Sequence, residues 1–157
     1  MFDALVAITQ SERFEGISGT VLCRDRNEFE SAENSGKCAA ILGIEGAEVI
    51  DCDPCRLSEL YGAGVKVIGP TWNIYNGLCG TASELSHKGL TEKGREFCGE
   101  AVRLGMKLDV SHASEAAALE MVRLYGGNVF ASHSNSFSVC SHRRNISDRL
   151  FLEIAES

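Results

Sequence analysis

Short apolar runs alternate with stretches of helical periodicity along most of the chain. Each run has the length of one strand, and the five runs are Thr20–Cys23, Lys37–Ile44, Val65–Ile68, Met106–Val110 and Asn128–Ala131. The stretches between and after them predict helices at Arg26–Glu33, Pro54–Tyr61, Thr91–Leu104 and Ser114–Tyr125, and from about Ser147. The run Lys37–Ile44 is almost continuously apolar, which is typical of a strand that is buried on both faces of a parallel sheet.

This alternation predicts an α/β fold. Strands that alternate with helices of this length form βαβ units, and their right-handed crossovers place the strands parallel to one another in a sheet. A polar stretch from Asn73 to about Lys88 interrupts the pattern, and a loop of that length suggests a functional role.

The composition is that of an ordinary soluble domain, and it narrows the choice of partners. The chain has 157 residues, of which 44% are hydrophobic, and its formal net charge is −7. Because nucleic-acid binding needs a clustered basic face and the basic residues are scattered, we expect no nucleic-acid partner. No apolar run reaches the roughly 18 residues of a membrane span, and the first residues do not resemble a signal peptide. We therefore expect no membrane span and a cytoplasmic protein.

The seven cysteines are predicted to be reduced thiols, because their number is odd and no secretion signal precedes them. Cys52 and Cys55 have the spacing of a CxxC motif, but no second pair completes a four-cysteine zinc site. We interpret them as loop cysteines rather than as a metal or redox site.

Three of the predicted strands are followed by a side chain that can bind a metal ion. Glu45, His112 and His133 each come within a few residues of the end of such a strand. The carboxyl ends of parallel strands meet at one rim, so these residues can converge there. Two imidazoles and a carboxylate suit zinc or a similar divalent ion, which can activate a water molecule for hydrolysis. The alternative is that each residue is a polar group satisfied locally at a strand end.

Several local motifs resemble those of the membrane dipeptidase (renal dipeptidase) family of zinc-dependent peptidases, a family of metal-dependent barrels. They occur in the order of the family and are Ile41–Gly46, Leu60–Val65, Gly89–Glu96, Leu104–His112, Ala131–Ser134 and Cys140–Asn145. The resemblance implies a partial TIM-type (β/α) barrel with parallel strands and about five to six βα units. A complete barrel takes about 250 residues. We therefore interpret residues 1–157 as the central portion of one barrel domain, truncated at both ends.

The resemblance also implies a role for individual residues. Glu45 matches the carboxylate that bridges two metal ions, and His112 and His133 match the histidines that complete the binding of the second ion. Arg144 matches the arginine that pairs with the carboxylate of the substrate, for which a guanidinium fork is well suited. Asp109 lies three residues before His112. If the strand end bends, it is expected to orient a metal ligand without contacting the metal ion itself.

The chain also departs from the pattern of the family. Trp72 stands where many relatives carry a histidine that contacts the reaction centre, and Asn73 is expected to replace that polar group in part. Trp72 and Asn73 are therefore predicted to contact substrate. The His-x-Asp motif that holds the first metal ion and the acidic residue of the last barrel strand are absent, and His87 and His142 are interpreted as surface residues.

The resemblance implies a metal-dependent dipeptidase that hydrolyses the peptide bond of dipeptides with a metal-activated water as nucleophile. The expected cofactor is zinc, bound as one or two divalent ions. This chain holds the ligands of the second ion only. The expected partner is a dipeptide substrate, and a homodimer is compatible with the sequence. The alternative is a catalytically silent partial barrel that binds a single metal ion or serves as an interaction module.

Overall fold

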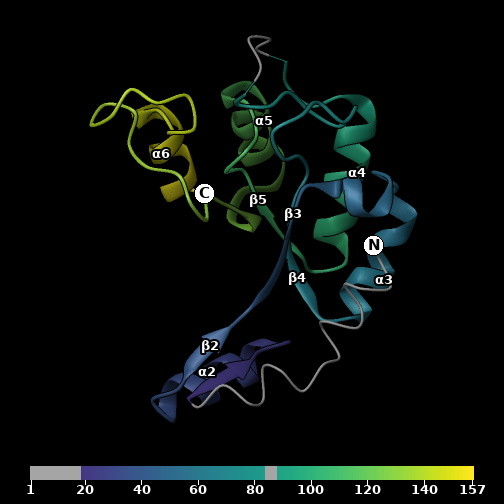
Figure 1. Cartoon of the computed structure of the whole chain (residues 1–157), viewed down its shortest axis with the longest axis vertical. Helices are drawn as coiled ribbons and strands as arrows, with labels where there is room; N and C mark the ends of the chain where they lie inside the picture. Colours follow the sequence, from purple (N-terminus) through teal and green to yellow (C-terminus); the bar gives the residue numbers. More distant parts are fainter. Residues whose placement is uncertain (1–18, 84–87) are drawn as a thin grey trace.

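The computed structural model describes residues 19–83 and 88–157, and these form two parallel sheets (Figure 1). Strands β1 (Thr20–Leu22) and β2 (Cys38–Ala40) form a two-stranded sheet. The larger sheet has the order β3-β4-β5-β6, and all its neighbouring strands are parallel. Its strands are β3 (Leu42–Glu45), β4 (Val65–Gly69), β5 (Lys107–Asp109) and β6 (Val129–Phe130). The predicted parallel α/β class is confirmed.

Helices follow most of these strands. They are α2 (Arg26–Asn34), α3 (Leu57–Gly62), α4 (Glu92–Arg103), α5 (Glu115–Tyr125) and α6 (Asp148–Ala155). Three short 3-10 turns lie between them, at Ala47–Ile50, Pro54–Arg56 and Gly126–Asn128. The side chains of Thr91, Ser114 and Ser147 accept backbone N–H bonds at the starts of α4, α5 and α6, because a capping oxygen replaces the missing intrahelical partner.

One predicted strand is wrong. The run Lys37–Ile44 forms two strands, because the chain changes neighbours at Ile41: β2 pairs with β1, whereas β3 pairs with β4. Ile41 is 51% exposed, and no residue of β2 or β3 is buried. The expectation of a strand buried on both faces is therefore wrong here, since no layer of structure covers both faces of this segment.

The hydrophobic core lies between the four-stranded sheet and the helices α3, α4 and α5, which pack beside it (Figure 1). Leu108 is fully buried in β5, where it pairs with Ile68 of β4 and Val129 of β6. Phe97 of α4 and Met121 of α5 are also fully buried in this core. Burial of this apolar surface fixes the strands relative to one another, so the residues that follow the strands are held in place.

The four strands run in the same direction, so their carboxyl ends form one rim, which we call the strand-end rim. Glu45 is the last residue of β3, and the loops after β5 and β6 carry His112 and His133. No helix among the described residues is long and apolar enough to cross a membrane.

Candidate metal centre

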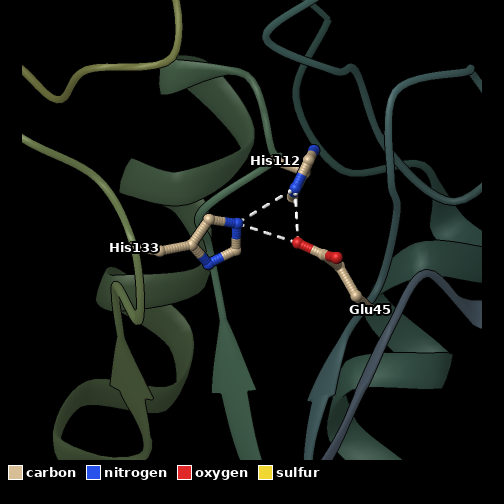
Figure 2. A group of neighbouring side chains, drawn as sticks. All are labelled: Glu45, His112 and His133. Carbon is tan, nitrogen blue, oxygen red and sulfur yellow. Dashed lines mark hydrogen bonds and ion pairs between the residues drawn. The ribbon is translucent and has the colours of Figure 1, made fainter.

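Glu45, His112 and His133 converge at the strand-end rim (Figure 2). Glu45 Oε1 lies 2.5 Å from Nε2 of His112 and 2.8 Å from Nε2 of His133, and the two Nε2 atoms are 3.2 Å apart. The His112 side chain is 9% exposed, whereas those of Glu45 and His133 are about half exposed. The group therefore has one buried side and one side open to solvent.

Backbone geometry places Glu45 and His112 at this point. Gly46, directly after Glu45, has a φ of 90°, and a Cβ at Gly46 would lie 3.1 Å from Cβ of Trp72, so glycine suits this turn. The backbone around His112 is fixed by two bonds: the carbonyl of His112 accepts from the N–H of Ala82, and the next residue donates its N–H to the carbonyl of Val110.

Asn73 contacts the Nδ1 side of the His112 ring, while the Nε2 side faces Glu45. Its Oδ1 is 3.0 Å from Nδ1 of His112 and also accepts a bond from the hydroxyl of Ser83. Because a carbonyl oxygen only accepts, Nδ1 of His112 carries the proton, and its Nε2 turns a lone pair toward Glu45. Burial lowers the pKa of His112, the positive charge of Arg144 lowers it further, and Glu45 acts in the opposite direction. The net effect favours the neutral ring, which is the form that binds metals.

Asp109, the last residue of β5, lies outside the group of three, and its carboxylate reaches the segment after β6. Its carboxylate accepts bonds from the backbone and the hydroxyl of both Ser111 and Ser132. Burial alone would raise the pKa of Asp109, but these hydrogen bonds outweigh it and hold the pKa below its usual value. Asp109 thus stays ionised and ties the ends of the two strands together.

Arg144 presents a partly buried positive charge close to the centre. Its Nη1 atom is buried without a hydrogen-bond partner, and burial lowers the pKa of the guanidinium, against the effect of Glu45 and Asp109. A cavity of about 310 Å³ is lined by Arg144 and by Ser111 and Ala113, the residues on either side of His112. Space, a cation and the candidate metal centre therefore adjoin one another.

The other candidate residues lie at or outside the edge of this arrangement. Trp72 is 47% exposed, and its ring centroid is 6.1 Å from that of His112. His142 is exposed and accepts a bond from the backbone N–H of Arg144, while His87 lies outside the described residues. Cys52 is buried and Cys55 exposed, and they take no part in a metal-ligating group within the ranges 19–83 and 88–157.

The donor set fits a divalent metal ion. The neutral His112 ring and the Glu45 carboxylate direct acceptor atoms to one point, and Nε2 of His133 lies at the third corner. Ligand atoms at about 2.0–2.1 Å from a tetrahedral zinc ion are about 3.3 Å apart. The two rings match this spacing at 3.2 Å, whereas Glu45 Oε1 lies closer to both, at 2.5 and 2.8 Å, and would have to move apart from them to bind the same ion. A cation between the three atoms would remove their mutual repulsion.

The residues that contact Nδ1 of the two histidines were not identified from the sequence. From the sequence, Asn73 is expected to contact substrate, and Ser132 belongs to the motif Ala131–Ser134 but has no role assigned, although it stands directly before His133. A polar side chain next to a candidate ligand is the signal that could have identified Ser132, because metal-binding histidines usually donate their second ring N–H to a partner.

Comparisons with known proteins agree with this geometry. A family model described as "Membrane dipeptidase (Peptidase family M19)" matches residues 17–157. The chain is 34% identical over 130 residues to an uncharacterized dipeptidase of Schizosaccharomyces pombe, covering 80% of this chain and 31% of that protein.

Two solved structures are similar in both sequence and fold. A metallopeptidase from Rhodobacter sphaeroides, liganded with a phosphinate mimic of the dipeptide L-Ala-D-Ala, has a TM-score of 0.79 at 32% identity, covering 89% of this chain and 42% of that one. The M19 metallopeptidase dipeptidase AC has a TM-score of 0.82 at 30% identity, covering 98% and 47%. The chain thus spans less than half of each of these relatives, and its open four-stranded sheet is part of a TIM-barrel-like fold, as predicted.

Proposed function

The chain belongs to the membrane dipeptidase family, and we propose that it contributes the metal centre of a dipeptidase that hydrolyses the peptide bond of dipeptides. The observation that carries this proposal is the convergence of Glu45, His112 and His133 from three separate strand ends. The core contacts of the strands do not require two imidazoles and a carboxylate at one point, whereas metal-assisted hydrolysis does.

We assign zinc as the ion, with Glu45 as the ligand that a second ion would share. Zinc supplies a Lewis acid and a water molecule whose pKa is lowered toward neutrality. The chain contributes the geometry: the buried His112 ring is fixed by Asn73, and the open side next to Glu45 and His133 leaves room for water and substrate.

Arg144 and the adjoining cavity fit the carboxylate end of a dipeptide. Within the described ranges the Arg144 guanidinium makes no ion pair, and one of its nitrogens is buried without a hydrogen-bond partner. A partly buried cation of this kind gains from a bidentate carboxylate, because the ion pair offsets the cost of desolvation. A dipeptide mimic bound to the Rhodobacter sphaeroides relative supports this class of substrate.

We place Trp72 at the mouth of the site, where its half-exposed ring beside His112 can cover bound substrate. The role of Asn73 is different from that of Trp72, because its Oδ1 is already occupied by the His112 ring. Asn73 therefore acts on the reaction mainly through the orientation of His112.

The proposal is tested by hydrolysis of L-Ala-D-Ala by the zinc-loaded protein. We expect turnover that Glu45→Gln abolishes and that Arg144→Met weakens mainly through a higher KM, since the substrate carboxylate loses its partner. Arg149→Met, which removes an exposed arginine from α6, is the matched control and should leave turnover unchanged. Zinc binding without hydrolysis of any dipeptide would contradict the proposal and favour the catalytically silent alternative.

A further inference from the structure

Two serines flank His133, and they differ in one respect. Ser132 Oγ lies 2.6 Å from Nδ1 of His133 and also contacts Oδ2 of Asp109. Ser134 Oγ, one residue after the histidine, is buried with no hydrogen-bond partner among the described residues. Only the serine before His133 therefore joins the ring to a charged group.

The contacts of Ser132 determine where its proton lies. The Asp109 carboxylate only accepts hydrogen bonds, so the contact between Ser132 Oγ and Asp109 Oδ2 requires the hydroxyl proton to lie between them. Ser111 likewise donates its hydroxyl proton to Oδ1 of Asp109, at 2.6 Å. Ser132 Oγ then has only lone pairs left for His133, and Nδ1 of the ring must be the donor in the 2.6 Å bond.

We propose that Asp109, acting through Ser132, holds His133 as the Nδ1–H tautomer so that Nε2 presents its lone pair at the metal centre. Ser132 and Asp109 are thus positioning residues. The proposal rests on the proposed metal centre for its functional meaning, but the proton on Nδ1 is held by the chain itself. Without a metal ion, Nε2 of His133 faces the Glu45 carboxylate at 2.8 Å and can carry a proton as well. A carboxylate supports the ligand histidine here through an intervening hydroxyl rather than by direct contact.

The two ligand histidines are held by different parts of the chain. Asn73, from the segment after β4, accepts the Nδ1 proton of His112, whereas the Asp109–Ser132 pair links the ends of β5 and β6. Both rings consequently direct Nε2 to the same point. Removal of the Ser132 hydroxyl should release only the His133 ring, because the backbone N–H of Ser132 still donates to Asp109.

The tautomer can be measured directly on the metal-free chain. Long-range ¹⁵N–¹H correlation spectra of histidine-labelled protein distinguish a protonated Nδ1 from a protonated Nε2. We expect Nδ1 of His133 to be protonated in the wild type, to lose this proton to Nε2 beside Glu45 in Ser132→Ala, and to regain it in Ser132→Thr, which restores the hydroxyl. Asp109→Asn should also disturb the ring, because an amide can donate to Ser132 and leave its hydroxyl proton for Nδ1.

Zinc affinity gives the second readout, by calorimetric titration with zinc alone. Loss of a group that orients a metal-binding histidine weakens binding by about 10–100-fold, so we expect that loss for Ser132→Ala and recovery for Ser132→Thr. Ser134→Ala is the matched control, since it deletes a neighbouring hydroxyl that bonds to nothing in the described structure, and it should bind zinc as the wild type does.

The proposal fails if the His133 ring of the folded, metal-free wild type carries a proton on Nε2 but none on Nδ1, or if Ser132→Ala binds zinc as tightly as Ser134→Ala. If Ser132→Ala does not fold, the wild-type spectrum and the affinity of Ser132→Thr still decide the question. A wild type with the Nδ1–H ring that binds no zinc would contradict the proposed metal centre but support the assigned tautomer, so the two failures are distinguishable.

Discussion

The two parallel sheets of this chain are built from similar strands, but only one of them has a core. In the β1–β2 sheet all six strand residues are partly or fully exposed, and the buried residues nearby are limited to Cys23 and Ala32 among those described. In the four-stranded sheet Val65, Ile68 and Leu108 are fully buried beneath helices. The candidate metal centre lies only on the second sheet.

This difference shows that a rigid site needs covered strands and not only parallel ones. Three ligands from separate strands must be held to a fraction of an ångström, and a packed core resists the shifts that would separate them. The β1–β2 sheet, seen at the end of the molecule away from the main helices in Figure 1, has no comparable cover.

The largest expected effect is on the free energy of unfolding, and it comes from a leucine-to-alanine substitution in the four-stranded sheet compared with the same change in the β1–β2 sheet. Leu108→Ala opens a cavity in the core and should lower the free energy of unfolding by about 2–5 kcal/mol, whereas Leu22→Ala on the half-buried β1 should cost less than half as much. Urea denaturation measures both. Equal losses would mean that the two sheets are equally well packed and would remove the basis of the comparison.

Zinc should stabilise one sheet and not the other. At a zinc concentration 100 times Kd, the free energy of unfolding should rise by about 2.7 kcal/mol. Hydrogen exchange should slow at the ends of β3, β5 and β6 but not in β1 or β2. Glu45→Gln should abolish the effect, while His142→Ala, which removes an exposed histidine outside the centre, should retain it. A zinc response that survives Glu45→Gln would place the ion elsewhere.

Acid should weaken the junction of β5 and β6 selectively. Because the pKa of Asp109 is lower in the folded than in the unfolded chain, its ionised form adds stability above about pH 4, and this contribution is lost as the pH falls through the folded pKa. Unfolding experiments from pH 6 to pH 2 should therefore show a shallower acid loss for Asp109→Asn than for the wild type. Identical pH dependence would show that Asp109 is not preferentially ionised in the fold.

The smallest effect on the free energy of unfolding is expected from a surface substitution on α2, beside the β1–β2 sheet. Arg26 and Glu30 form an exposed ion pair on α2, and such pairs add little to stability because water screens both charges. Glu30→Gln should therefore change the free energy of unfolding only slightly, and less still at high salt. A larger loss would indicate that α2 depends on this pair because it lacks a core.

The sequence was sufficient to predict the features that depend on local chemistry and on parallel topology. The helix starts at Thr91, Ser114 and Ser147 follow from capping side chains, and the convergence of Glu45 with the two histidines follows from the common direction of the strands. These predictions required only the order of the elements and the type of residue at each end.

The features that depend on contacts between distant segments were not predictable in the same way. The division of Lys37–Ile44 between two sheets depends on which strands compete for pairing, and an apolar run carries no information about its neighbour. The bond of Asn73 to His112 joins residues 39 positions apart, and the Asp109–Ser132 contact spans 23. Such bonds depend on side-chain positions that only the packed rim defines.

The central claim is that the strand-end rim binds a divalent metal through Glu45, His112 and His133. Anomalous diffraction from crystals of the zinc-loaded protein, recorded at the zinc absorption edge, tests it most directly. We predict one peak about 2.0–2.2 Å from a Glu45 carboxylate oxygen and from Nε2 of both histidines. No peak at this point, or zinc bound by Cys52 and Cys55 instead, would contradict the account.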